Sequence, residues 1–220
     1  MFLELKQEIE QQHNATLIAV SKTQPIEKIK MLYDNGQRHF GENKVQEMLD
    51  KKEQLPTDIY WHAIGHLQSN KVKYIVPFIH LIHSVDSFNL LKTIEKEAAK
   101  VYRKISILLQ IHIADEETKF GLNKNELIDL LEHVMAQKEN FSHIEICGLM
   151  GMASFTDDEH KIEQEMQGLQ NLFLFIKNSY FPLSASFKEI SMGMSSDYKI
   201  ALKCGSTLVR VGSLLFGKRD

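Results

Sequence analysis

Residues 188–219 read KEISMGMSSDYKIALKCGSTLVRVGSLLFGKR, and this stretch indicates the fold class more clearly than any other part of the chain. Apolar residues concentrate at 189–192 and again at 207–211, which predicts two strands. The segment between them, 197–203, has the periodicity of a helix. A strand, a helix and a second strand in so short a span are typical of an α/β protein built from strand–helix units.

The same alternation extends back to the N-terminus. Further strands are predicted at residues 16–21, 38–41, 60–64, 79–83, 105–113 and 144–150. Helices are predicted at 25–34, 44–52, 67–76, 87–100, 124–137 and 157–179, with Ser87 and Asn123 as N-caps. Eight strands alternating with helices, with no break in composition, favour a closed (β/α)₈ TIM barrel over an open sheet. We expect residues 1–220 to form a single domain.

Composition and charge exclude several classes of protein. The chain has 220 residues, of which 43% are hydrophobic and 25% charged, enough to bury a core. Its net charge of −3 is spread without a basic block, so nucleic acid is not an expected partner. Neither a signal peptide nor a long apolar segment is evident, so no membrane partner is expected. Two isolated cysteines, Cys147 and Cys204, fit a reducing cytoplasm.

In a barrel of this kind, functional groups gather at the C-terminal ends of the strands, where the loops are free to vary. This rule selects polar and small residues at the predicted strand ends. They are Ser21, Lys22, Gly41, Glu42, Asn43, Gly65, His66, Gln68, His83, Ser84, Asp86, Thr118, Lys119, Met150, Ser191 and residues 210–213.

Two interpretations of Lys22 remain open on these grounds. Lys22 directly follows the apolar run LIAVS, at the end of the first predicted strand. A barrel wall that removes water from its ammonium group would favour the neutral amine, which is the nucleophile that forms an imine with an aldehyde. Alternatively, Lys22 covers apolar surface with its stem and keeps its charge in solvent.

The loops after the seventh and eighth strands carry Ser191, Gly212 and Ser213, and in barrels these two loops frequently bind phosphate. The glycines could also be ordinary turn residues. Arg210, at the end of the eighth strand, could extend over the barrel mouth. Because an arginine cannot accept a proton, it would keep a neighbouring pyridine nitrogen unprotonated. The alternative for Arg210 is an ion pair with a carboxylate.

The histidines do not predict a metal site. His62 and His66 are four residues apart, but they lie on either side of a strand end and not on one helix face. No cysteine or carboxylate nearby completes a set of ligands. His83 and His112 are expected to be buried, hydrogen-bonded side chains.

Seven segments together resemble the pyridoxal phosphate homeostasis protein family, and they cover nearly the whole chain. They are AVSKTQP (19–25), FGENKVQE (40–47), WHAIGHLQSNK (61–71), HSVD (83–86), GLMGMA (148–153), SMGMSSD (191–197) and GSTLVRVGSLLFGKR (205–219). The resemblance implies a barrel similar to the N-terminal domain of alanine racemase. It also implies that the protein carries pyridoxal 5'-phosphate (PLP) and supplies it to apo-enzymes, as a cytoplasmic monomer.

By the same resemblance, Lys22 holds PLP as a Schiff base, Ser191, Gly212 and Ser213 bind the phosphate, and Arg210 approaches the pyridine nitrogen. Asn43 and His83 are implied to be pocket neighbours. The sequence departs from the family pattern at His112, Phe120 and Ser213, and the segment before the first strand is short for a full N-terminal helix.

Three functions remain as hypotheses. The first is a PLP carrier or regulator without efficient catalysis. The second is a PLP-dependent amino-acid racemase, which needs a proton donor or acceptor on each face of the bound substrate. No second base is evident in the sequence, so we expect negligible racemase activity. The third is a barrel that binds another phosphorylated metabolite and forms no Schiff base.

Overall fold

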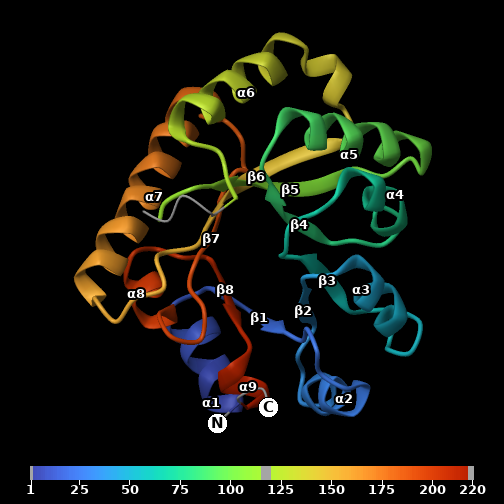
Figure 1. The fold of residues 1–220 in the computed structure, drawn as a ribbon, viewed down its shortest axis with the longest axis vertical. Coiled ribbons are helices and arrows are strands. Elements are labelled where there is room, and N and C mark those ends of the chain that lie inside the picture. The colour runs from blue at the N-terminus through green and yellow to red at the C-terminus, as the bar shows by residue number, and fades with distance from the viewer. Residues whose placement is uncertain (1, 115–119, 218–220) are drawn as a thin grey trace.

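The computed structural model describes residues 2–114 and 120–217. Its strands form one closed, all-parallel barrel in sequence order (Figure 1). The strands are β1 (Thr16–Val20), β2 (His39–Glu42), β3 (Tyr60–Ala63), β4 (Leu81–Val85), β5 (Ile105–Ile111), β6 (Ile144–Gly151), β7 (Glu189–Ser191) and β8 (Leu208–Val211). The barrel closes where β1 pairs with β8, with Thr16 opposite Leu208 and Ala19 opposite Val211. The predicted (β/α)₈ barrel is therefore confirmed.

Helices follow the strands and form the outer layer. They are α2 (Ile26–Asp34), α3 (Val45–Lys52), α4 (Val72–Ile75), α5 (Phe88–Lys100), α6 (Lys124–Ala136), α7 (Glu159–Tyr180), α8 (Tyr198–Lys203) and α9 (Ser213–Phe216), with 3₁₀ turns η2 (Ser69–Lys71) and η3 (Lys138–Phe141). Both predicted N-caps are confirmed: the Ser87 hydroxyl accepts from the Leu90 amide, and Asn123 forms a capping box with Glu126.

The largest difference from prediction lies in the helix expected over residues 67–76. The structure has a 3₁₀ turn and a single α-helical turn there, preceded by Gln68 in an extended conformation. Leu67 is nevertheless buried, so this segment contributes an apolar anchor without being helical. The strand bounds differ from prediction by no more than two residues.

The N-terminal segment is helical despite its shortness. A helix α1 (Phe2–Gln7) continues into a π-helical turn η1 (Glu8–Gln12) before β1 begins. Leu5 and Ile9 are buried, because this segment packs against the barrel. Among the described residues, no helix is both long and apolar enough to cross a membrane.

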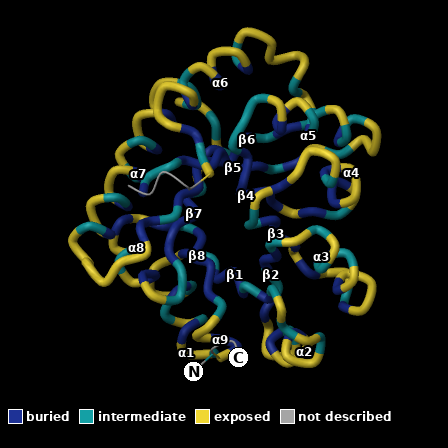
Figure 2. The backbone as a smooth tube through the Cα atoms, in the orientation of Figure 1, coloured by how far each residue is buried: buried dark blue, intermediate teal, exposed yellow. Residues whose placement is uncertain are grey.

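Alternation along the strands divides the core into two parts. In β1, Leu17 and Ala19 belong to the large apolar core, whereas Ile18 belongs to a smaller cluster with Leu108 and Leu208. Because successive strand residues point to opposite faces, the large core lies between strands and helices and the small cluster lies inside the barrel. Figure 2 shows the strands as the buried centre and the helices as the exposed rim.

Candidate functional site

A pocket of about 550 Å³ opens at the C-terminal ends of the strands. This volume lies within the range of small-molecule sites. The pocket is lined by Val20, Lys22, Asn43, Ile64, Met152, Met194, Ser195, Ser196, Arg210, Gly212 and Ser213. These residues come from the ends of six strands, β1, β2, β3, β6, β7 and β8, and the closed barrel is what brings them together.

Of the seven predicted site residues, five line this pocket: Lys22, Asn43, Arg210, Gly212 and Ser213. The other two, His83 and Ser191, are fully buried in the barrel interior. Thr118 and Lys119, also nominated from the sequence, lie outside the described residues.

Lys22 lies in the turn between β1 and α2 and is half-buried. The next residue, Thr23, has a φ of 65°, an uncommon conformation for a residue with a side chain. The amide of Thr23 donates to the Glu47 carboxylate, which fixes this turn to helix α3. The position of Lys22 is therefore set by contacts on both sides of it.

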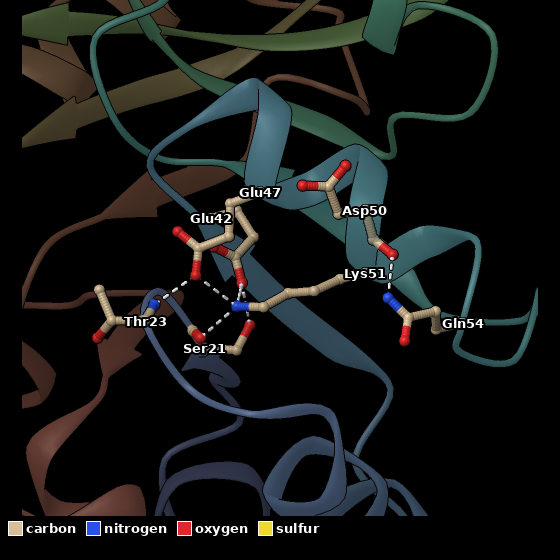
Figure 3. Close-up of polar contacts among 7 residues, drawn as sticks. All are labelled: Ser21, Thr23, Glu42, Glu47, Asp50, Lys51 and Gln54. Atoms are coloured by element: carbon tan, nitrogen blue, oxygen red, sulfur yellow. Dashed lines mark hydrogen bonds and ion pairs between the residues drawn. The ribbon is translucent and has the colours of Figure 1, made fainter.

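The turn rests on a buried ionic network centred on Lys51 (Figure 3). The Lys51 ammonium donates to the Ser21 carbonyl at 2.6 Å, to Glu42 Oε1 at 2.8 Å and to Glu47 Oε1 at 2.7 Å. The Ser21 hydroxyl donates to the same Glu42 oxygen at 2.6 Å. Burial raises the pKa of Glu42, and the hydrogen bonds from Lys51 and Ser21 offset part of that rise. Sequence reasoning missed this network because it joins residues from β1, β2 and α3.

Arg210 forms the floor of the pocket. Its side chain is only 4% exposed, and it donates from Nη1 to the Ser191 hydroxyl at 2.5 Å and from Nη2 to the Gly151 carbonyl at 3.0 Å. Burial lowers the pKa of Arg210 to about 10, so it remains a cation at neutral pH. These two hydrogen-bond partners are uncharged, and the Asp197 carboxylate acts on Arg210 through its charge, which opposes the lowering of the Arg210 pKa by burial.

Ser191 lies behind Arg210 and not on the pocket wall. Its hydroxyl contacts His83 Nδ1 at 2.9 Å as well as the guanidinium. Burial lowers the pKa of His83 well below its usual range, so the imidazole is neutral. Ser191 and His83 are thus placed to orient Arg210, whereas the sequence suggested phosphate contact for Ser191.

Two serines that the sequence analysis did not select, Ser195 and Ser196, line the pocket instead. The Ser195 hydroxyl accepts from the Gly212 amide at 3.1 Å, which ties the loops after β7 and β8 together. Asp197 holds the same loop by accepting from the Met194 amide at 2.5 Å. The available signal was the run of polar residues at 195–197, which begins two residues after Gly193.

The loop after β7 begins at Gly193, where there is no room for a side chain. Its φ is +91°, and a Cβ atom there would lie 2.5 Å from the Ala201 methyl group on α8. Its carbonyl also accepts from the Arg210 amide at 3.0 Å. A residue with a side chain would disturb both the serine loop and the strand that carries Arg210.

The histidines separate into two environments. His66 pairs with Asp86 at 3.3 Å and stacks on Phe120. His62 is buried inside the barrel and contacts His39 and His83. The two histidines that stand four apart in sequence therefore share no site.

The pocket combines a primary amine, hydroxyl groups, loop amides and a buried guanidinium. At the start of α9, the Leu215 and Phe216 amides donate to the Gly212 carbonyl and the Gly212 amide donates to Ser195, so the amides of Ser213 and Leu214 are the ones this turn can offer to an anion. Lys22 and Arg210 line the same pocket. This arrangement suits a phosphorylated aldehyde whose ring carries a hydrogen-bond acceptor.

Comparisons with known proteins agree with this geometry. The family model described as alanine racemase, N-terminal domain, matches residues 2–220. A pyridoxal phosphate homeostasis protein of Pasteurella multocida is 37% identical over 207 residues, which span 93% of this chain and 86% of that protein.

Solved structures give the same result. PipY of Synechococcus elongatus, solved without PLP, superposes with a TM-score of 0.87 at 33% identity, covering 98% of this chain and 97% of PipY. PipY solved with PLP bound gives a TM-score of 0.81 at 34% identity and covers 92% of each chain. The chain therefore belongs to the alanine racemase N-terminal domain family and, within it, to the pyridoxal phosphate homeostasis proteins.

Proposed function

We propose that this protein binds PLP as a Schiff base on Lys22 and acts in intracellular PLP homeostasis, as a carrier without efficient catalysis. The observation that carries the proposal is the meeting of Lys22, Arg210 and the Gly212–Ser213 loop in one pocket. Support comes from PipY, a relative at 34% identity that has been solved with PLP bound.

The pocket residues fit the parts of PLP. The Lys22 amine adds to the aldehyde carbon, and water leaves as the carbon–nitrogen double bond forms. Ser195, Ser196 and Ser213 offer hydroxyls to the phosphate, and Gly212, whose own amide donates to Ser195, lines the same part of the pocket. Asn43 forms part of the side wall.

Arg210 explains why bound PLP would be a poor catalyst. PLP supplies an electron sink whose strength depends on protonation of its ring nitrogen. A guanidinium that cannot accept a proton stabilises the unprotonated nitrogen, so the sink is weak. Ser191 and His83 hold Arg210 in place from behind.

The racemase alternative lacks a second base. Among the described residues that line the pocket, the ionisable side chains are Lys22 and Arg210, and none is a tyrosine. Tyr60 and Tyr74 are exposed, and the Tyr198 hydroxyl donates to Glu8 at 3.2 Å. Racemisation needs a proton donor or acceptor on each face of the bound substrate, and Lys22 can serve one face only.

The remaining parts of the proposal concern context. We propose a cytoplasmic monomer, formed by residues 1–220 as one domain, that passes PLP to apo-enzymes. The isolated buried cysteines fit a reducing compartment.

The proposal is tested by adding PLP to purified wild-type protein, Lys22→Ala and Lys30→Ala, and recording absorbance before and after borohydride. Lys30 is exposed on α2 and controls for unspecific reaction of surface lysines. We expect a reducible band in wild type and Lys30→Ala that is lost in Lys22→Ala. Peptide mapping of the reduced protein should locate the modification at Lys22.

Other outcomes favour the alternatives. If a ligand binds only when it carries a phosphate group and no reducible absorbance band forms, the result would indicate a barrel for another phosphorylated metabolite. Sustained conversion of L-alanine to D-alanine, measured by chiral chromatography and abolished by Lys22→Ala, would indicate a racemase. Either result would overturn the proposed carrier function.

A further inference from the structure

A second cavity, of about 510 Å³, opens at the opposite, N-terminal mouth of the barrel. Three histidines line it: His39 at the start of β2, His62 within β3 and His80 immediately before β4. One nitrogen from each ring can be chosen so that all three lie within 4.8 Å of one another. We propose that this mouth binds a divalent transition-metal ion such as Zn²⁺, with His39, His62 and His80 as its protein ligands.

Adjacent strands fix the three side chains. His62 lies opposite Gly41 on β2, two residues beyond His39, and opposite Leu81 on β4, one residue beyond His80. The His80 amide donates to the Trp61 carbonyl at 2.9 Å, which ties the start of β4 to β3. The ligands therefore come from rigid, hydrogen-bonded backbone and not from independent loops.

The spacing of the donor atoms is close to that of a metal site. Zinc–nitrogen bonds of about 2.0–2.1 Å place tetrahedral ligand nitrogens about 3.3 Å apart. His39 Nδ1 and His62 Nε2 are 3.0 Å apart. His80 is exposed, so its ring can move the remaining distance of roughly 1–2 Å by side-chain rotation.

The three imidazoles are electronically suited to metal binding. Burial lowers the pKa of His39 to about 4 and the pKa of His62 well below its usual range, and it also lowers the pKa of His80. Neutral imidazoles keep the lone pair that coordinates a metal. Imidazole nitrogen is a common ligand of Zn²⁺, Cu²⁺ and Ni²⁺.

The barrel interior supplies a second layer of contacts. His62 Nδ1 contacts His83 Nε2 at 2.9 Å, and His83 Nδ1 contacts the Ser191 hydroxyl at 2.9 Å. With Nε2 on a metal, His62 would donate its Nδ1 proton to His83, which would donate in turn to Ser191. Metal-bound histidines usually donate their second ring nitrogen in this way, which fixes the orientation of the ring.

Charges around the cavity are balanced. Lys6 lies near His39, but it pairs with Glu10 at 2.5 Å. Glu145 and Glu189 also line the cavity, where Glu145 pairs with Lys104 at 2.9 Å and Glu189 lies 3.9 Å from Lys188, so these carboxylates offset the lysine charges, and the Arg103 charge acts on His80. The Cys147 thiol is also present, but burial raises its pKa, and we do not assign it as a ligand. The fourth coordination position would face the cavity and take water.

The test is a titration of untagged, PLP-free protein with Zn²⁺ by calorimetry, repeated in competition with a chromophoric chelator. We expect one equivalent to bind to wild type. His39→Gln and His80→Gln should each weaken binding by at least about 10–100-fold, the loss seen when even outer-shell partners are removed. His133→Gln, at an exposed position on α6, is the matched control and should bind like wild type.

Substitution with Co²⁺ gives an independent readout, since visible absorption of the bound ion reports its coordination by nitrogen. Circular dichroism checks that both variants remain folded, which is expected because His39 is half-buried and His80 exposed. The proposal is overturned if wild type binds no Zn²⁺ stoichiometrically, or if binding persists unchanged in both variants. In that case the histidines are a hydrogen-bonded network only.

Discussion

Replacing Lys51 by methionine should destabilise the fold and loosen the turn that carries Lys22. Lys51 and Glu42 are 7% and 0% exposed, and their charged atoms are 2.8 Å apart. Methionine retains most of the side-chain stem but leaves the Glu42 carboxylate buried without its cation. Breaking a buried ion pair by removing one partner costs about 3–5 kcal/mol. In a chain of this size, that corresponds to a fall in Tm of about 6–20 °C.

The loss should depend on pH in a defined direction. The pKa of Glu42 is already raised by burial, and Lys51 opposes that rise, so the variant should raise it further. When the pKa of a carboxyl is higher in the folded than in the unfolded state, its ionisation destabilises the folded protein. This destabilisation is absent when the pH is below the unfolded pKa of about 4.5. Its penalty grows as pH rises through the folded pKa. The difference between variant and wild type should therefore be larger at pH 8 than at pH 5.

Urea unfolding at both pH values measures these differences. Lys52→Met is the control, because Lys52 is the exposed neighbour, 5.2 Å from the centre of the Phe78 ring, and should cost less than about 1 kcal/mol. The double variant Lys51→Met/Glu42→Gln should recover part of the loss, since it removes the buried charge. A Lys51→Met protein as stable as Lys52→Met, or a loss independent of pH, would refute the reasoning.

Three further predictions concern single side chains, each measured by urea unfolding. Gly193→Ala should destabilise the protein by about 1–3 kcal/mol through the steric clash with α8. Gly168→Ala, in an exposed helical position with no neighbour within 4 Å, should stabilise it by up to about 1 kcal/mol. A Gly193→Ala protein more stable than Gly168→Ala would contradict the steric argument. Ser191→Ala leaves Arg210 Nη1 without its acceptor and should cost about 1–3 kcal/mol, and an unchanged stability would show that water replaces the hydroxyl. Phe187→Ala, at a fully buried position, should cost about 3–5 kcal/mol, and a loss below 1 kcal/mol would mean that the cavity collapses.

The order of strands and helices could be predicted from sequence because it depends on local periodicity. Strand positions were correct to within two residues, and the N-caps Ser87 and Asn123 were identified from their side-chain chemistry. The short segment before β4 was predicted less well, because Leu67 gives an apolar pattern that a 3₁₀ turn satisfies equally well. The N-terminal helix was doubted because its stability comes from packing on the barrel and not from its length.

By itself, the sequence determined the alternation of elements, the closed barrel and the position of most pocket residues at strand ends, since parallel strands place their C-terminal ends on one rim. Only the tertiary structure decided which polar groups face the pocket. It placed Ser195 and Ser196 on the wall and Ser191 behind Arg210, because loop geometry after β7 depends on contacts with α8 and β8. It also brought His39, His62 and His80 together, which sequence spacing does not reveal because neighbouring strands in a parallel barrel are separated by whole helices.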